Sequence, residues 1–120
     1  MTAVKEDIYA ALSTISDAQV LDIYPKTWTK LPVIVYQEED NKVQETSDNN
    51  HEDYSYVRFA IYIWATGSTT ALACAVDAAI APLGLIRIQC SDVDDPSGLR
   101  HKVMRYEGVI DANKYVYTAD

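Results

Sequence analysis

Two histidines and a large set of carboxylates are the residues of this chain that could perform chemistry. The imidazole of His51 or His101 titrates near neutral pH, so either ring beside a carboxylate could act as a general acid or base. Neither histidine stands in a recognisable catalytic motif. The sequence has no GxSxG nucleophile turn, and neither cysteine has a histidine in its local context. We therefore expect two solvated surface histidines and a chain that is not an enzyme and has no catalytic residue.

The carboxylates of residues 90–98 come closest to a metal-binding loop. A calcium loop places oxygen ligands at positions one, three and five, with a glycine next. Asp92 and Asp94 fill the first two of these positions. Pro96 occupies the third, and Ser97 stands where the glycine is required, so the pattern favours an Asx-type turn. Glycine-rich phosphate-binding motifs are missing as well, and we expect no metal site and no cofactor.

Length and charge restrict the classes of partner. The chain has 120 residues, enough for one domain, residues 1–120, with one core. Its net charge of -8 is the wrong sign for a protein that grips nucleic-acid phosphates. No run approaches the ~20 apolar residues of a spanning helix, and charges at residues 5–7 interrupt any signal peptide, so we expect a cytosolic chain. Cys74 and Cys90 lack CxxC spacing and are expected to be buried, reduced thiols.

The elements that would position a site are clearest between Tyr54 and Leu83. One side of the expected strand at residues 54–65 is apolar, with Val57, Phe59, Ile61 and Ile63, which is typical of a half-buried strand. The other side carries amphipathic residues of the types enriched where protein surfaces meet, and we take these as a candidate subunit or partner interface: Tyr54, Tyr56, Arg58, Tyr62 and Trp64. The alternative is that these rings pair across strands within one molecule, beside Tyr106, Tyr115 and Tyr117.

The spacing of apolar residues predicts the remaining elements. Steps of three and four predict a helix over residues 3–15 and an alanine-rich helix that begins after Ser68 or Thr69 and ends at Gly84. Strands are predicted at residues 20–24, 31–37, 54–65, 85–91, 102–110 and 114–118. This order predicts an α+β fold, with a mainly antiparallel sheet and two helices packed on one of its faces.

The polar segment 38–53 separates two of these strands. Val43 is its only apolar residue, so it has no core of its own, and a connection of this length is usually functional or mobile. We expect a long acidic hairpin loop that projects toward a partner. Its carboxylates are Glu38, Glu39, Asp40, Glu45, Asp48, Glu52 and Asp53. They could hold a divalent ion weakly, although charge runs are commonly only solvating.

Several segments together form a recognisable layout over nearly the whole chain. They are residues 8–12 (IYAAL), residues 31–36 (LPVIVY), residues 61–65 (IYIWA) with the alanine-rich helix that follows, and residues 104–106 (MRY). This pattern of elements and hydrophobic positions resembles the tail terminator, or tail completion, proteins of long-tailed bacteriophages, the small tail-to-head joining family.

The resemblance implies an α+β subunit that assembles into a homohexameric ring. Such a ring would cap the tail tube, stop tail polymerisation and offer a docking surface to the head connector. The expected partners are further copies of the chain, the tail tube protein and the head connector protein. DNA would pass through the lumen without specific binding. The chain would be made in the host cytoplasm, would meet no membrane, and would end in the virion tail.

Two alternatives remain open at this point. One is another phage neck or minor tail component that shares the fold. The other belongs to a different class, a small ligand-binding or metal-assisted enzyme, and it requires His51, His101 and the carboxylates to converge in one pocket.

Overall fold

In the described residues, each of the two helices is followed along the chain by a run of three strands. The computed structural model describes residues 4–16, 18–22, 31–46, 52–111 and 116–117. The helices are α1 (Lys5–Leu12) and α2 (Thr70–Ile80), and a 3-10 turn, η1 (Ala81–Leu83), follows α2. The strands are β1 (Gln19–Leu21), β2 (Val33–Thr46), β3 (Glu52–Ala65), β4 (Ile86–Val93), β5 (Arg100–Asp111) and β6 (Val116–Tyr117).

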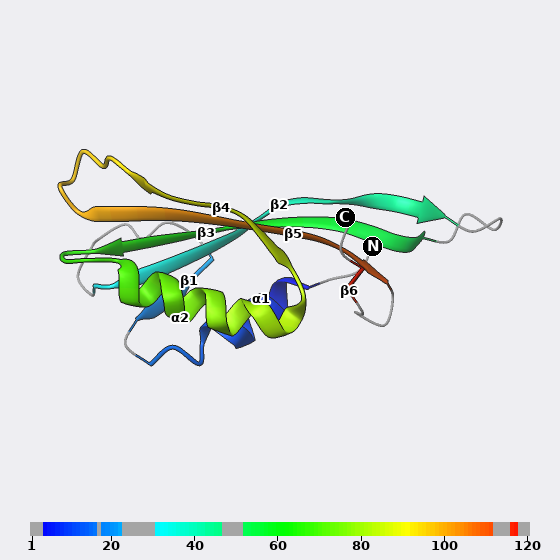
Figure 1. Ribbon diagram of the computed structural model, residues 1–120, viewed down its shortest axis with the longest axis horizontal. Helices are drawn as coiled ribbons and strands as arrows, with labels where there is room; N and C mark the ends of the chain where they lie inside the picture. The colour runs from blue at the N-terminus through cyan, green and yellow to red at the C-terminus, as the bar shows by residue number, and fades with distance from the viewer. Residues whose placement is uncertain (1–3, 17, 23–30, 47–51, 112–115, 118–120) are drawn as a thin grey trace.

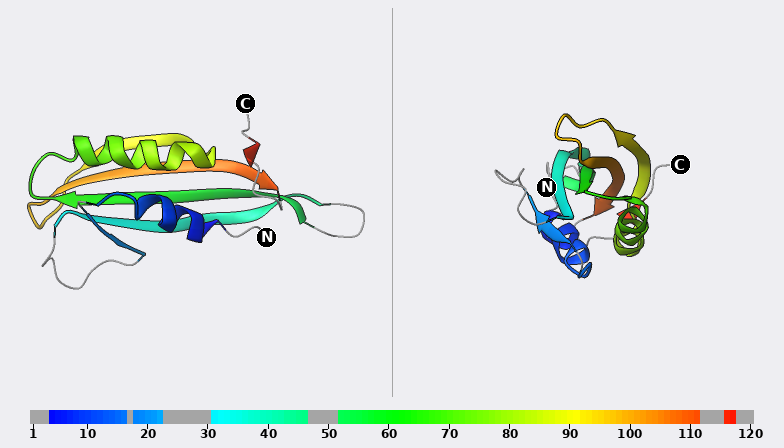
Figure 2. Two further views of the ribbon diagram at one scale, coloured as in Figure 1. Left: turned by 90° about the horizontal axis from the view of Figure 1, so that it is seen from below. Right: turned by 90° about the vertical axis from the view of Figure 1, so that its left-hand side faces the viewer.

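These strands form one curved sheet in the order β1-β2-β3-β5-β4, with β6 beside β5. Strand β1 runs parallel to β2, and the other described pairings are antiparallel. Both helices lie on the same face of the sheet (Figures 1 and 2). The predicted α+β fold, with a mainly antiparallel sheet and two helices on one face, is therefore confirmed. No helix in the described part of the chain has the length and apolar character needed to cross a membrane.

The core lies between the helices and the sheet. The alternating side of β3 that was predicted to be apolar faces the helices and is fully buried: Val57, Phe59, Ile61 and Ile63. Ile8 and Leu12 of α1 and Val76 and Ile80 of α2 pack in the same cluster, and none of these four side chains has exposed surface. Each such side chain stabilises the fold by about 1.5–3 kcal/mol through burial.

Helix α2 packs on the sheet through the small residue Ala73 and through polar contacts of Asp77. Ala73 is buried against the core cluster. On β5, the Tyr106 hydroxyl is buried and donates a hydrogen bond to Oδ1 of Asp77 at 2.9 Å. Arg87 of β4 contacts the same oxygen at 3.2 Å. Burial raises the pKa of Tyr106, so its hydroxyl remains a proton donor. Gly84 ends the helical segment in the left-handed conformation, with φ 83°, as the sequence predicted.

In its described residues, 38–46 and 52–53, the acidic segment is strand, which corrects the prediction of loop at these positions. Glu38, Glu39, Asp40 and Glu45 lie in β2, and Glu52 and Asp53 begin β3. The backbone of β3 forms an antiparallel ladder with this polar stretch, in which Lys42, for example, lies opposite Tyr56. The ladder shifts register between Glu38 and Asp40 and again beyond Val43. Backbone pairing with an adjacent apolar strand thus extends β2 where the side-chain pattern gives no signal. Asp48 and His51 lie outside the described residues.

Two smaller predictions also change. Helix α1 begins at Lys5 and not at residue 3, with Val4 at its N-cap and no side-chain cap. The helix ends at Leu12, where the Ser13 hydroxyl donates to the Tyr9 carbonyl at 2.7 Å. The two cysteines are free but exposed, so the prediction of buried thiols was wrong.

Candidate functional site on the second face of the sheet

The sheet face opposite the helices, called the second face from here on, gathers the residues predicted as an interface. Tyr54, Tyr56, Arg58 and Tyr62 are partly buried there, and Trp64 is 3% exposed. Alternation along β3 places all five side chains on this side, because their neighbours in sequence fill the helix-facing core. The structure therefore brings the predicted set onto one surface, from one end of β3 to the other.

Trp64 anchors a stack of three rings at one end of the second face. Its indole lies 4.2 Å from the His101 ring of β5, centroid to centroid, at an interplanar angle of 12°. The Tyr62 ring lies 5.8 Å away on the same strand. Val33 and Val35 of β2 complete a small buried cluster with Trp64. Aromatic pairs in such contact add about 0.5–1.5 kcal/mol beyond area burial, so this end of the face is internally fixed.

Asp95, in the turn between β4 and β5, connects this stack to the backbone. Its Oδ1 accepts the Ser97 backbone N–H at 2.9 Å, and its Oδ2 accepts the Trp64 indole N–H at 2.8 Å. These donors, led by Ser97, lower the pKa of Asp95 from 3.8 to about 2. The bond from the Ser97 N–H to the Asp95 side chain, two residues earlier, confirms the predicted Asx-type turn. The Gly98 N–H donates to the Asp95 backbone carbonyl at 3.0 Å and closes the same turn.

His101 is covered by this arrangement and is not a solvated surface residue. Its side chain is 11% exposed, and its Nδ1 lies 3.8 Å from Oδ2 of Asp95. Burial lowers the pKa of His101, and the nearby carboxylate only partly opposes that effect. The ring is therefore neutral at pH 7 and packs between aromatic and carboxylate neighbours. The expectation of a solvated surface histidine is corrected, because cross-strand pairing places His101 opposite Trp64.

A charged cluster occupies the middle of the second face. Oε1 of Glu39 accepts hydrogen bonds from Nε of Arg58 at 3.0 Å and from Nε of Arg105 at 3.1 Å. Nη1 of Arg105 also donates to Oε1 of Gln89 at 2.6 Å. Residues of β2, β3, β5 and β4 thus meet in one network, which ties Arg58 to a carboxylate that the sequence had assigned to a projecting loop.

Tyr56 holds the far end of the face. Its hydroxyl donates to Oε2 of Glu107 at 2.5 Å, and Nζ of Lys42 lies 5.0 Å from the ring centroid. The bond to Glu107 is the main cause that raises the pKa of the Tyr56 hydroxyl, so the phenol remains a donor. The ring is amphipathic and half-buried, with one polar contact already made within the chain.

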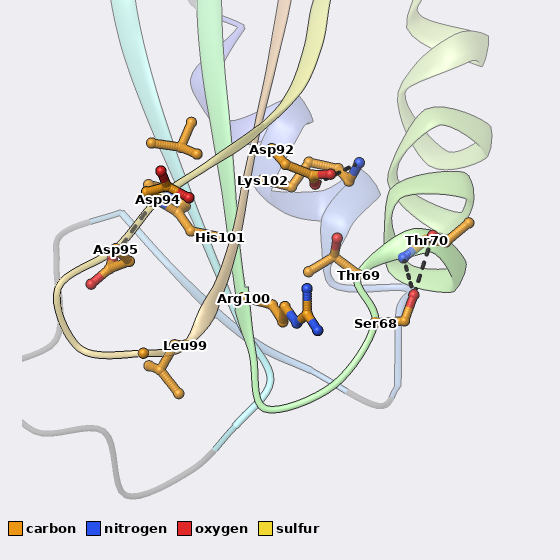
Figure 3. Close-up of a pocket in the computed structure, with 12 residues that line it drawn as sticks. Ser68, Thr69, Thr70, Asp92, Asp94, Asp95, Leu99, Arg100, His101 and Lys102 are labelled. Atoms are coloured by element: carbon orange, nitrogen blue, oxygen red, sulfur yellow. Dashed lines mark hydrogen bonds and ion pairs between the residues drawn. The ribbon is translucent and has the colours of Figure 1, made fainter.

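A groove of about 820 Å³ opens at the end of the sheet where α2 begins. Figure 3 shows Ser68 and Thr69 at the helix start on one side of the groove, with Arg100, Lys102 and Asp92 across from them. Nζ of Lys102 lies 3.0 Å from Oδ1 of Asp92, which compensates both charges. Among the described residues, no three His, Cys, Asp or Glu side chains are placed to share a metal ion. The groove lining thus offers hydrogen-bonding groups without a paired nucleophile and base.

Sequence reasoning missed the β5 half of the second face. Arg105 and Glu107 are central to its hydrogen bonds, yet neither was a candidate. The alternation of Arg105 and Glu107 with His101 is visible in the sequence. The pairing of β3 with β5, which leaves β4 at the edge of the sheet, joins segments that are distant in sequence, and no local pattern predicts it. Tyr106, expected beside the rings in one alternative, lies on the helix side. Tyr115 is outside the described residues.

Comparison with known proteins adds no relative to this picture. No protein-family model matches the chain, and no curated protein matches it.

Proposed function

We propose that this chain is a structural assembly protein of a long-tailed phage. Copies form a hexameric ring that caps the tail tube, terminates tail polymerisation and offers a docking surface to the head connector. The observation that carries the proposal is the second face. In the described residues no helix covers it, and partly buried Tyr56, Arg58 and Tyr62 are each held by neighbours in the same chain. Side chains that are already held in one conformation before binding lose less conformational entropy on association.

The charge distribution supports the same proposal. The net charge is -8, and the cluster around Glu39 binds both Arg58 and Arg105. Cations paired in this way are poor ligands for phosphates, and an acidic wall repels a polyanion. A ring of such subunits lets DNA move through its lumen without gripping it. The proposed partners are accordingly other copies of the chain, the tail tube protein and the head connector protein, in the virion tail.

The direct test of this function is a tail polymerisation assay. Tail tube protein is allowed to polymerise with and without the purified chain, and tube lengths and tube ends are measured by electron microscopy. A terminator shortens the tubes in proportion to its concentration and appears as a cap on one end. Tubes of unchanged length that carry no cap would contradict the proposal. In phage lacking the chain, overlong tails support a terminator, whereas tails of normal length with unjoined heads identify another neck component.

A further inference from the structure

Strand β4 leaves one edge of the sheet open. It pairs with β5 on one side, and no described strand lies on its other side. Every β4 residue except Ser91 is exposed. Three of the exposed residues are large and apolar, with exposed fractions of 40% for Ile86, 41% for Ile88 and 41% for Val93. An edge with unpaired backbone groups and apolar side chains is a template for another strand. Strand β4 has a bulge at Ile88 but no lysine or proline, and its charged residues Arg87 and Asp92 are ion-paired within the chain.

Strand β2 leaves the opposite edge open over most of its length. Strand β1 covers only Val33, Ile34 and Val35. From Tyr36 onward, no strand in the described part of the chain pairs with the outer side of β2. Figure 1 shows this half of β2 extending well beyond β1. The sheet therefore has two unlike open edges, on opposite sides of one subunit.

The directions of the strands make these two edges complementary. Three successive antiparallel pairings, β2 with β3, β3 with β5 and β5 with β4, leave β4 antiparallel to β2. A second copy rotated about an axis along the strands places its β2 antiparallel beside the first copy's β4. We infer that β4 of one copy pairs in this way with residues 36–42 of the next copy. In such a head-to-tail contact, the two partners contribute different surfaces. Successive copies form a closed ring when the rotation between neighbours brings the last copy back to the first.

The other edge pairings are less favourable. Pairing β2 with β2 would bring together the exposed carboxylate of Glu38 and the partly buried Asp40 from two chains, and like charges across strands are destabilising. Pairing β4 with β4 would leave the outer side of β2 open on both copies. Closure by β4 with β2 leaves no long edge unpaired. This pairing would be the contact between subunits in the proposed assembly. It rests on the proposed function only in requiring that several copies of the chain associate.

A disulfide can report the contact, because Cys90 is exposed on β4 and stands opposite Met104, on the helix side of the sheet. In a Cys74→Ser background, new cysteines are placed on β2 by Glu38→Cys or Asn41→Cys. Both positions pair with helix-side residues of β3, so they share the side of Cys90. Under mild oxidation, at least one of these variants should form disulfide-linked dimers and higher species. Gln37→Cys, whose partner Ala60 lies on the second face, is the matched control and should not cross-link.

A second variant tests the same edge without cysteine. Replacing exposed apolar residues by Ile86→Lys and Ile88→Lys should raise the dissociation constant of self-association at least about tenfold and leave the circular dichroism spectrum unchanged. Ala71→Lys, at an exposed apolar residue on α2, is the control and should not change the constant.

Each other outcome has a definite meaning. If the chain associates but neither helix-side cysteine cross-links and the lysine variants associate normally, the edge contact is wrong while the assembly function stands. If Cys74→Ser alone forms Cys90-linked dimers, β4 pairs with β4, and the head-to-tail contact is overturned. A chain that remains monomeric at every concentration removes both the contact and the assembly function.

Discussion

Among single residues, Trp64 bears on whether the aromatic side of β3 contacts a partner or pairs across strands within the molecule. Its indole stacks on His101 and donates to Asp95, and only 3% of the residue is exposed. Cross-strand pairing within the molecule therefore accounts for this ring. Tyr56 and Tyr62 keep part of their surface exposed, and they belong to the part of the second face that remains available to a partner.

The first prediction concerns the indole. Trp64→Ala removes the ring stack and leaves a cavity beside Val33 and Val35, and we expect a loss of about 3–5 kcal/mol in the free energy of unfolding. Urea denaturation followed by circular dichroism measures it. Tyr9→Ala, at a residue 47% exposed, serves as control and should cost much less. Equal losses for the two variants would show that the Trp64 cluster is not a stabilising core.

The second prediction concerns pH. The pKa of Asp95 is about 2 in the folded chain and 3.8 ordinarily, so folding lowers its affinity for the proton. Its ionised form therefore stabilises the fold above about pH 4, and this stabilisation is lost as the pH falls toward 2. Asp95→Asn should lower the free energy of unfolding at pH 7, and its difference from wild type should shrink between pH 4 and 2. Urea titrations across this range measure it, and a difference independent of pH would contradict the assignment.

At the scale of elements, sequence periodicity predicted α2 and the apolar side of β3 because their burial pattern is local. It failed for residues 38–46, where the side chains are polar and the strand is stabilised by backbone pairing with β3. The candidate site was predicted only in its β3 half for the same reason. Arg105, Glu107 and Asp95 reach the second face through pairings between distant segments, which periodicity does not encode.

The third prediction tests the end of α2. Gly84 has φ 83°, a conformation that costs an L-residue about 1 kcal/mol, so Gly84→Ala should lower the free energy of unfolding by about that amount. Thermal unfolding and urea titration both measure the change. Gly67→Ala is a matched control, because a Cβ atom there meets nothing within 4 Å. A neutral Gly84→Ala would mean that the helical segment ends in another conformation.

At the scale of the whole molecule, the chain is a one-sided sheet. Helices cover one face of the sheet (Figure 2). A hydrogen-bonded aromatic and charged surface forms the other face, and both sheet edges have unpaired stretches in the described residues. We propose that the unpaired backbone groups of these edges pair with another copy of the chain. Ring closure, tail capping and passage of DNA through a lumen all depend on this proposed association.

Sedimentation velocity of the purified chain over a wide range of concentrations tests this association most directly. We expect the 13.4 kDa subunit to convert, as concentration rises, to a closed species of about six times that mass, without further growth. A single 13.4 kDa species at every concentration would contradict it.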